Sequence, residues 1–129
     1  MRRRGAIAVM LAALAAGLVG CASAQTRVDA DEPTAVVKVG EEVVVDLGEV
    51  NSSVGTEWVL VEEPDPAVLG GEDVDFVSDQ PNPPPGSSSN MTVTFDAVGA
   101  GETTLTYEYR FRGEASKDRG PLTFTITVR

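Results

Sequence analysis

The sequence predicts an all-β domain over residues 34–129. Through most of this stretch apolar and polar residues alternate with a period of two, which is typical of strands with one buried face. Gly and Pro residues separate the alternating runs, and none of the runs has the apolar period of an amphipathic helix. About seven short strands in roughly 100 residues favour an immunoglobulin-like β-sandwich.

The first four expected strands are short. They cover residues 35–39, 42–47, 57–61 and 74–77. In the second of them Val43, Val45 and Leu47 fall on one face, because successive strand residues point to opposite sides. The third contains Trp58, the single Trp of the chain, and we expect it to be the largest side chain of the core.

The last three expected strands have the most regular alternation. They cover residues 91–97, 103–110 and 122–128. In the last strand Leu122, Phe124, Ile126 and Val128 alternate with Thr residues, so one face is apolar and the other polar. The single Cys, at position 21, excludes the internal disulfide of true immunoglobulin domains, so only the sandwich architecture is predicted.

Three of the connections between the expected strands are long. We call them the first loop (residues 49–56), the second loop (residues 78–90) and the third loop (residues 111–120). If successive strands are antiparallel, alternate connections meet at the same end of the sandwich, and these three loops lie together. Long loops grouped on a rigid scaffold are a common place for binding, and the alternative is that they are only variable surface loops.

The composition excludes several classes of function. The chain has 129 residues with 20 Asp and Glu, 10 Lys and Arg and no His, which gives a net charge of −10. Without His there is no Ser-His-Asp or Cys-His catalytic group and no imidazole ligand for a metal. The negative charge disfavours binding to the phosphates of nucleic acids. We therefore expect no metal, no cofactor and no nucleic acid partner.

The first 21 residues have the features of an export signal. Arg2 to Arg4 precede an apolar stretch over residues 6–19, which is too short to span a membrane as a helix. The run Leu18-Val19-Gly20-Cys21 resembles the bacterial lipoprotein signal. The resemblance implies a signal peptide over residues 1–20, cleavage before Cys21 and a lipid on its sulfur. The alternative is an ordinary secretory peptide that is cut near Ala22-Ser23-Ala24.

Residues 21–33 are expected to form the lipidated Cys and a flexible tether. Residues 22–33 are small, polar or charged and have no periodic pattern. Loss of residues 1–20 removes three Arg and no acid, so the mature chain carries 7 basic and 20 acidic residues, a net charge of −13. We expect a monomer that is held at the cell membrane by the lipid on Cys21, with its domain on the extracytoplasmic face.

The first loop contains Asn51-Ser52-Ser53-Val54-Gly55, the second contains Gly86-Ser87-Ser88, and Arg110-Phe111 opens the third. In this order the three loops resemble those of the chagasin family of cysteine protease inhibitors. The first loop of that family reads N-P-T-T-G with a Trp three residues later, and Asn51, Gly55 and Trp58 match it in residue and spacing. Gly86-Ser87-Ser88 stands where the family has a Gly-rich second loop, and Arg110 matches the Arg of its R-P-W or R-P-F motif. The resemblance covers roughly residues 34–129 and implies an immunoglobulin-like sandwich with three binding loops at one end.

The resemblance also implies a mechanism of inhibition. The three loops of the family enter the active-site cleft of a papain-like cysteine protease as a wedge and block it without covalent chemistry. The matching residues of this chain divide among the three loops. Asn51, Ser53, Val54 and Gly55 would lie over the catalytic thiol, Gly86, Ser87 and Ser88 beside it, and Arg110 and Phe111 on the opposite side.

Two other classes of function stay open on the sequence. Ser52-Ser53-Val54 differs from the P-T-T of the family, which favours a non-inhibitory surface lipoprotein that uses the same loops to bind another partner. The other class is an enzyme, because Asp73, Asp75 and Asp79 are close in sequence and paired carboxylates can act in acid–base catalysis. No nucleophile is nearby, so we expect no enzyme. The spacing of these acids does not match a Ca²⁺-binding loop either, so we expect no Ca²⁺ site.

Overall fold

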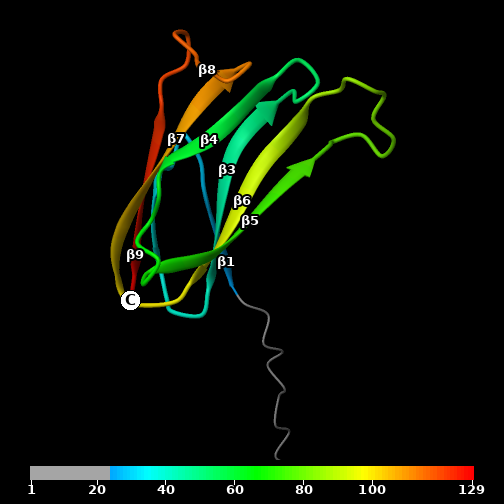
Figure 1. The fold of residues 1–129 in the computed structure, drawn as a ribbon. Helices are drawn as coiled ribbons and strands as arrows, with labels where there is room; N and C mark the ends of the chain where they lie inside the picture. The colour runs from blue at the N-terminus through cyan, green and yellow to red at the C-terminus, as the bar shows by residue number, and fades with distance from the viewer. Residues whose placement is uncertain (1–23) are drawn as a thin grey trace, which may run out of the picture.

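The computed structural model describes residues 24–129, and in this range it contains nine strands and no helix (Figure 1). The strands are β1 (Gln25–Val28), β2 (Thr34–Val37), β3 (Glu42–Val50), β4 (Thr56–Glu62), β5 (Leu69–Val77), β6 (Ser89–Ala97), β7 (Gly101–Phe111), β8 (Glu114–Ala115) and β9 (Leu122–Val128). The all-β prediction is confirmed. The predicted signal peptide over residues 1–20 and the lipidation site Cys21 lie outside the described residues. Within residues 24–129 no helix is long and apolar enough to cross a membrane.

The strands form two sheets that pack face to face. The first sheet has the order β1-β3-β6-β5, and the second has the order β2-β9-β7-β4 with β8 beside the end of β7. β1 is parallel to β3 and β2 is parallel to β9, whereas the other strand pairs are antiparallel. This is the sandwich architecture that the alternating sequence predicts.

β1 lies in the segment for which the sequence predicts a flexible tether. The prediction is wrong for Gln25–Val28, which pair with residues 42–45 of β3, and the side chain of Val28 is fully buried. Arg27 also forms a salt bridge of 2.6 Å with Asp46 on the neighbouring strand. A four-residue strand with one buried residue has too little alternation to be recognised from the sequence, and its order depends on pairing with β3.

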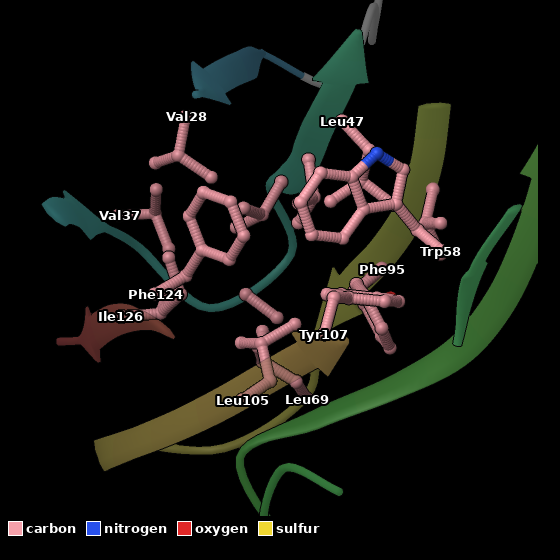
Figure 2. Packing of buried hydrophobic residues seen from close by; sticks show 14 of the residues in the cluster. Val28, Val37, Leu47, Trp58, Leu69, Phe95, Leu105, Tyr107, Phe124 and Ile126 are labelled. Carbon is pink, nitrogen blue, oxygen red and sulfur yellow. The ribbon is translucent and has the colours of Figure 1, made fainter. Parts of the chain in front are cut away.

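The core lies between the two sheets and consists of the alternating apolar residues (Figure 2). Val45 and Phe95 of the first sheet belong to the same buried cluster as Leu105, Phe124 and Ile126 of the second. Burying each such side chain stabilises the fold by about 1.5–3 kcal/mol. The apolar faces expected from the alternation of these strands are therefore the faces that the core uses.

Trp58 anchors the part of the core nearest the long loops, as the sequence predicts. Its side chain is 6% exposed, and its ring meets the ring of Tyr109 edge-on with the centroids 5.0 Å apart. The two residues are directly opposite each other in the pairing of β4 with β7. Since β4 follows the first loop and β7 precedes the third, this aromatic pair fixes the bases of both loops side by side.

The three long loops lie at the same end of the sandwich, which confirms the prediction (Figure 1). They follow β3, β5 and β7, and the antiparallel pairing of β3 with β6 and of β4 with β7 brings their bases together. The opposite end holds the short turn between β2 and β3, the turn between β6 and β7, and the end of the chain at Arg129.

Candidate functional site

Asn51 organises the first loop through both its side chain and its backbone. The Ser53 N–H donates to Asn51 Oδ1 at 3.1 Å, and the Asn51 N–H donates to Thr56 Oγ1 at 2.8 Å. The Asn51 carbonyl accepts hydrogen bonds from the N–H groups of Val54 at 3.2 Å and Thr56 at 3.1 Å. The loop is therefore a closed turn, because Asn51 is bonded to three of the residues that follow it.

The Asn51 side chain also joins the first loop to the second. Its Nδ2 group donates a hydrogen bond of 2.9 Å to the carbonyl of Gly86. Gly86 begins the Gly86-Ser87-Ser88 run and lies within a turn over residues 84–87. The N–H and Oγ of Ser87 close this turn by donating to the Pro84 carbonyl at 3.2 and 2.6 Å. The residues expected in the first two loops are thus brought together by a side-chain amide.

Gly55 joins the first loop to the third. Its carbonyl accepts a hydrogen bond of 2.8 Å from the Arg112 N–H. Its φ is +89°, and a Cβ atom at this position would lie 3.0 Å from Arg112 Cγ. Gly is therefore favoured here both by the left-handed backbone and by the close approach of the neighbouring loop.

The tip of the first loop is exposed to solvent. Ser52, Ser53 and Val54 all point away from the core, and Val54 is 49% exposed. The tip therefore offers two hydroxyl groups and one apolar side chain to a partner, on a backbone held from both sides. Ser88 of the second loop is exposed as well, whereas Ser87 is half-buried.

The third loop begins with a tight hairpin between β7 and β8. Phe111 pairs with Glu114, and the two residues between them, Arg112 and Gly113, have φ values of +51° and +83°. Positive φ at both central positions is the conformation of a type I′ turn, which matches the twist of the two strands. Sequence reasoning missed this hairpin because Arg is an uncommon residue at such a position.

Arg110 and Phe111, the residues expected on the far side of the cleft, differ in accessibility. Arg110 is half-buried, and its Nε donates a hydrogen bond of 3.0 Å to Glu108 Oε1 on the same strand. Phe111 is 47% exposed, with the Arg112 guanidinium 5.1 Å from the centre of its ring. Phe111 is therefore available to a partner, whereas Arg110 is engaged within the strand.

A groove of about 480 Å³ beside the third loop is a feature that sequence reasoning did not identify. Its walls include Tyr109, Phe111, Lys117 and Arg119. The Arg119 guanidinium lies 4.7 Å from the centre of the Tyr109 ring. The only signal in the sequence is the frequency of Lys and Arg in this segment, which does not reveal that Arg119 folds back onto β7.

The acidic residues considered for catalysis lie on β5 and at the start of the second loop. Asp73 and Asp75 are exposed on β5, an edge strand of the first sheet, and Asp79 is exposed just beyond it. Among the described residues no group of His, Cys, Asp or Glu has the arrangement of a metal site.

Comparison with known proteins places this geometry in a family. The fold is similar to that of amebosin, with 21% sequence identity and a TM-score of 0.64 over 82% of this chain and 98% of that one. It is also similar to a cysteine protease inhibitor from Entamoeba histolytica, with 20% identity and a TM-score of 0.65 over 85% of this chain and all of that one. No curated protein matches the sequence significantly. The model of the chagasin family of peptidase inhibitors, I42, matches residues 36–128. The chain therefore belongs to the chagasin family.

Proposed function

We propose that this protein inhibits papain-like cysteine proteases by inserting its three loops into the active-site cleft. The observation that carries the proposal is the central position of the first loop, which is bonded to the second through Asn51 and Gly86 and to the third through Gly55 and Arg112. A wedge needs such a central element with support on both sides. Members of this family are peptidase inhibitors and not enzymes, so the catalytic role considered for Asp73, Asp75 and Asp79 is excluded.

The inhibition requires no covalent chemistry. In the proposed complex the tip formed by Ser53 and Val54 covers the catalytic thiol and excludes the substrate. The closed turn around the Asn51 carbonyl keeps the loop from adopting the extended conformation of a cleavable substrate. Because the loop is already ordered by its neighbours, binding costs less conformational entropy than the ordering of a free peptide.

The other two loops contact either side of the cleft. Gly86 to Ser88 lie on one side of the first loop and Phe111 lies on the other, as the bonds from Asn51 and Gly55 support. Phe111 is the large exposed apolar side chain of the third loop, and aromatic residues often dominate the free energy of protein association. Arg110 then contributes by orienting the end of β7 through Glu108 rather than by direct contact.

An inhibition assay tests the proposal. The chain without residues 1–20 and with Cys21→Ser is titrated against papain and cathepsin-like proteases, with the rate of peptide hydrolysis as the readout. We expect competitive inhibition, and we expect it to disappear when residues 51–55 are replaced by a Gly-Ser segment of equal length. Absence of inhibition at micromolar protein would contradict the proposal and favour a non-inhibitory surface binding module.

The second part of the proposal is that the protein is a monomer anchored by a lipid on Cys21 at the extracytoplasmic face of the cell membrane. The Leu18-Val19-Gly20-Cys21 run supports the anchor. β1 is parallel to β3, and its first residue, Gln25, pairs with Glu42 at the end of the sandwich opposite the loops. A chain anchored four residues before Gln25 reaches at most about 14 Å, so the loops would point away from the membrane.

Mass spectrometry of the protein purified from membranes tests the anchor. We expect an N-terminal peptide that begins at acylated Cys21, and a Cys21→Ser variant that is not retained by membranes. An unmodified N-terminus at Gln25 would instead support the ordinary secretory peptide.

Exposed Asp73 and Asp75 on the edge strand β5 support the monomer, because like charges oppose pairing with a second copy. Light scattering tests that state directly.

A further inference from the structure

The distribution of charge separates the third loop from the rest of the domain. We define residues 110–119 as the cationic segment, since it contains four of the seven Lys and Arg of residues 24–129 and only two of the 20 Asp and Glu. Its net charge is +2, whereas the other described residues carry three cations and 18 acids, a net charge of −15. A local positive region on a strongly acidic protein produces a field with a defined direction.

Arg112 is held in place without an acidic partner. Its backbone N–H donates to the Gly55 carbonyl, and its guanidinium lies 5.1 Å from the centre of the Phe111 ring. The two salt bridges among residues 24–129 are those of Arg27 with Asp46 and of Arg110 with Glu108. The stacked guanidinium therefore keeps its N–H groups for an external acceptor while its orientation is restricted by the ring.

Arg119 has the same kind of support at the other end of the cationic segment. Its guanidinium lies 4.7 Å from the centre of the Tyr109 ring, and Tyr109 is in turn packed against the buried Trp58. Arg119 is exposed and takes part in neither of the two salt bridges. Stacking on a residue that is itself fixed by the core limits the motion of Arg119 and so lowers the entropy cost of pairing it.

The groove beside the third loop is lined by two cations of the cationic segment. Arg119 and Lys117 line it together with Tyr109 and Phe111, so it combines aromatic walls with positive charge. Glu114 and Asp118 also line the groove, but neither forms a salt bridge with the Arg residues. The arrangement suits an apolar projection of a partner that is accompanied by carboxylates.

We propose that Arg112, Lys117 and Arg119 form a cationic arm that pairs with carboxylates beside the cleft of the target protease. This inference rests on the proposed inhibitory function and adds the chemistry of the partner, a papain-like protease with an acidic wall next to its active site. The acidic body of the inhibitor repels such a protease everywhere except at the arm. The charge distribution therefore selects both the protease and the orientation in which the loops enter.

Charge reversal with a matched control tests the arm. The test variant carries Arg112→Glu and Arg119→Glu, and the control carries Lys38→Glu and Arg129→Glu, which lie at the opposite end of the sandwich and change the net charge equally. Association rates are measured at low and high salt against papain-like proteases that have acidic or basic residues beside the cleft. Thermal unfolding checks that both variants fold.

With the acidic-walled protease we expect the test variant to associate at least about tenfold more slowly than the wild type at low salt. The difference should shrink at high salt, and the control variant should change the rate by less than about twofold. Equal slowing in test and control variants, or no slowing in either, would overturn the inference while leaving inhibition itself intact. Lack of inhibition by the wild type would overturn both the proposed function and the arm.

Discussion

The two ends of the sandwich are built by different means. At the end opposite the loops, the backbone itself closes the structure. The N–H of Gly40 donates to the Ala97 carbonyl at 2.8 Å, the N–H of Val98 donates to the Val68 carbonyl at 2.9 Å, and Gly99 packs directly against the backbone of Ala67. At the loop end, a few hydrogen bonds from Asn51 and Gly55 hold long exposed segments together.

This difference separates stability from binding. Backbone contacts between the turns close the end opposite the loops, so a change there disturbs the packing of both sheets. The loop end contributes little buried apolar area, but its few bonds determine where Val54 and Phe111 are presented. Substitutions at the closed end should therefore lower the free energy of unfolding, and substitutions at the loop end should mainly lower affinity.

The largest effect on stability is expected for Gly99→Val. A Cβ atom at position 99 would collide with the Ala67 carbonyl oxygen, so the turn between β6 and β7 must move. We expect the free energy of unfolding to fall by about 2–3 kcal/mol, measured by urea denaturation. Ala100→Ser, at an exposed position of the same turn, is the control and should have almost no effect. If both variants are equally stable, the close packing assigned to this end is wrong.

The next effect is expected for Asn51→Ala, which removes the link to Gly86 and the acceptor for Ser53. The loss of about 1–2 kcal/mol of hydrogen-bond stabilisation should disorder the first loop. We expect inhibition to weaken by about 30-fold, with a smaller change in thermal stability than that caused by Gly99→Val.

Two further variants sharpen this result. Asn51→Asp keeps the Oδ1 acceptor but loses the Nδ2 donor, so it should weaken inhibition less than Asn51→Ala. Asn90→Ala is the matched control, because the Asn90 side chain makes no hydrogen bond within the described residues. An equal loss of inhibition in the Asn90 variant would argue against a specific role for Asn51.

A smaller effect distinguishes Gly55 from Gly86. Both have φ above +80°, so replacement by Ala strains the backbone at either position by about 1 kcal/mol. Only at Gly55 would the new Cβ also press on Arg112, whereas the space around Gly86 is open. We expect Gly55→Ala to weaken inhibition about threefold more than Gly86→Ala, as measured by inhibition constants. Equal effects would show that contact with the third loop is unimportant.

The smallest effect at neutral pH is expected at Tyr107, which lies in the core between the two ends. Burial, with a further contribution from the charge of Glu72, raises the pKa of the Tyr107 hydroxyl above its ordinary value. The hydroxyl has no hydrogen-bond partner among the described residues, so Tyr107→Phe should change stability by less than about 1 kcal/mol near pH 7.

The pH dependence gives the sharper test of Tyr107. Because its pKa is higher in the folded than in the unfolded state, the folded state binds the proton more strongly above about pH 10. The free energy of unfolding therefore does not depend on this group at lower pH, and it falls as the pH rises above the pKa of Tyr107 in the unfolded state. We expect the melting temperature of the wild type to fall more steeply between pH 9 and pH 11 than that of Tyr107→Phe. Parallel curves would contradict this account.

The core strands could be predicted from the sequence, but the shortest strands could not. In β9, four apolar residues alternate with Thr, so the local pattern alone identifies the buried face. β1 has one buried residue, Val28, and β8 has none, so neither carries such a pattern. β1 is ordered by pairing with β3, which is distant in sequence. β8 is ordered by the hairpin with β7, whose turn is formed by Arg112 and Gly113.

The candidate site was predictable as a set of loops but not as a network. Asn51, Gly55 and Arg110 match the loop motifs of the chagasin family. Alternate connections between successive antiparallel strands fall at the same end of a sandwich, which places the three loops together. The pattern does not show that Arg110 is bonded to Glu108 or that the Arg112 N–H donates a hydrogen bond to Gly55 of the first loop. Nor does it show that Arg119 stacks on Tyr109.

The sequence by itself therefore determined the fold class, the faces that enter the core and the order of the binding loops. These features depend on the alternation of residues within each strand, which is local information. Only the tertiary structure decided which loops touch and which cations stay available to a partner. Those contacts join residues such as Asn51 and Gly86 that are far apart in sequence, and they exist only after strand pairing and sheet packing have fixed the bases of the loops.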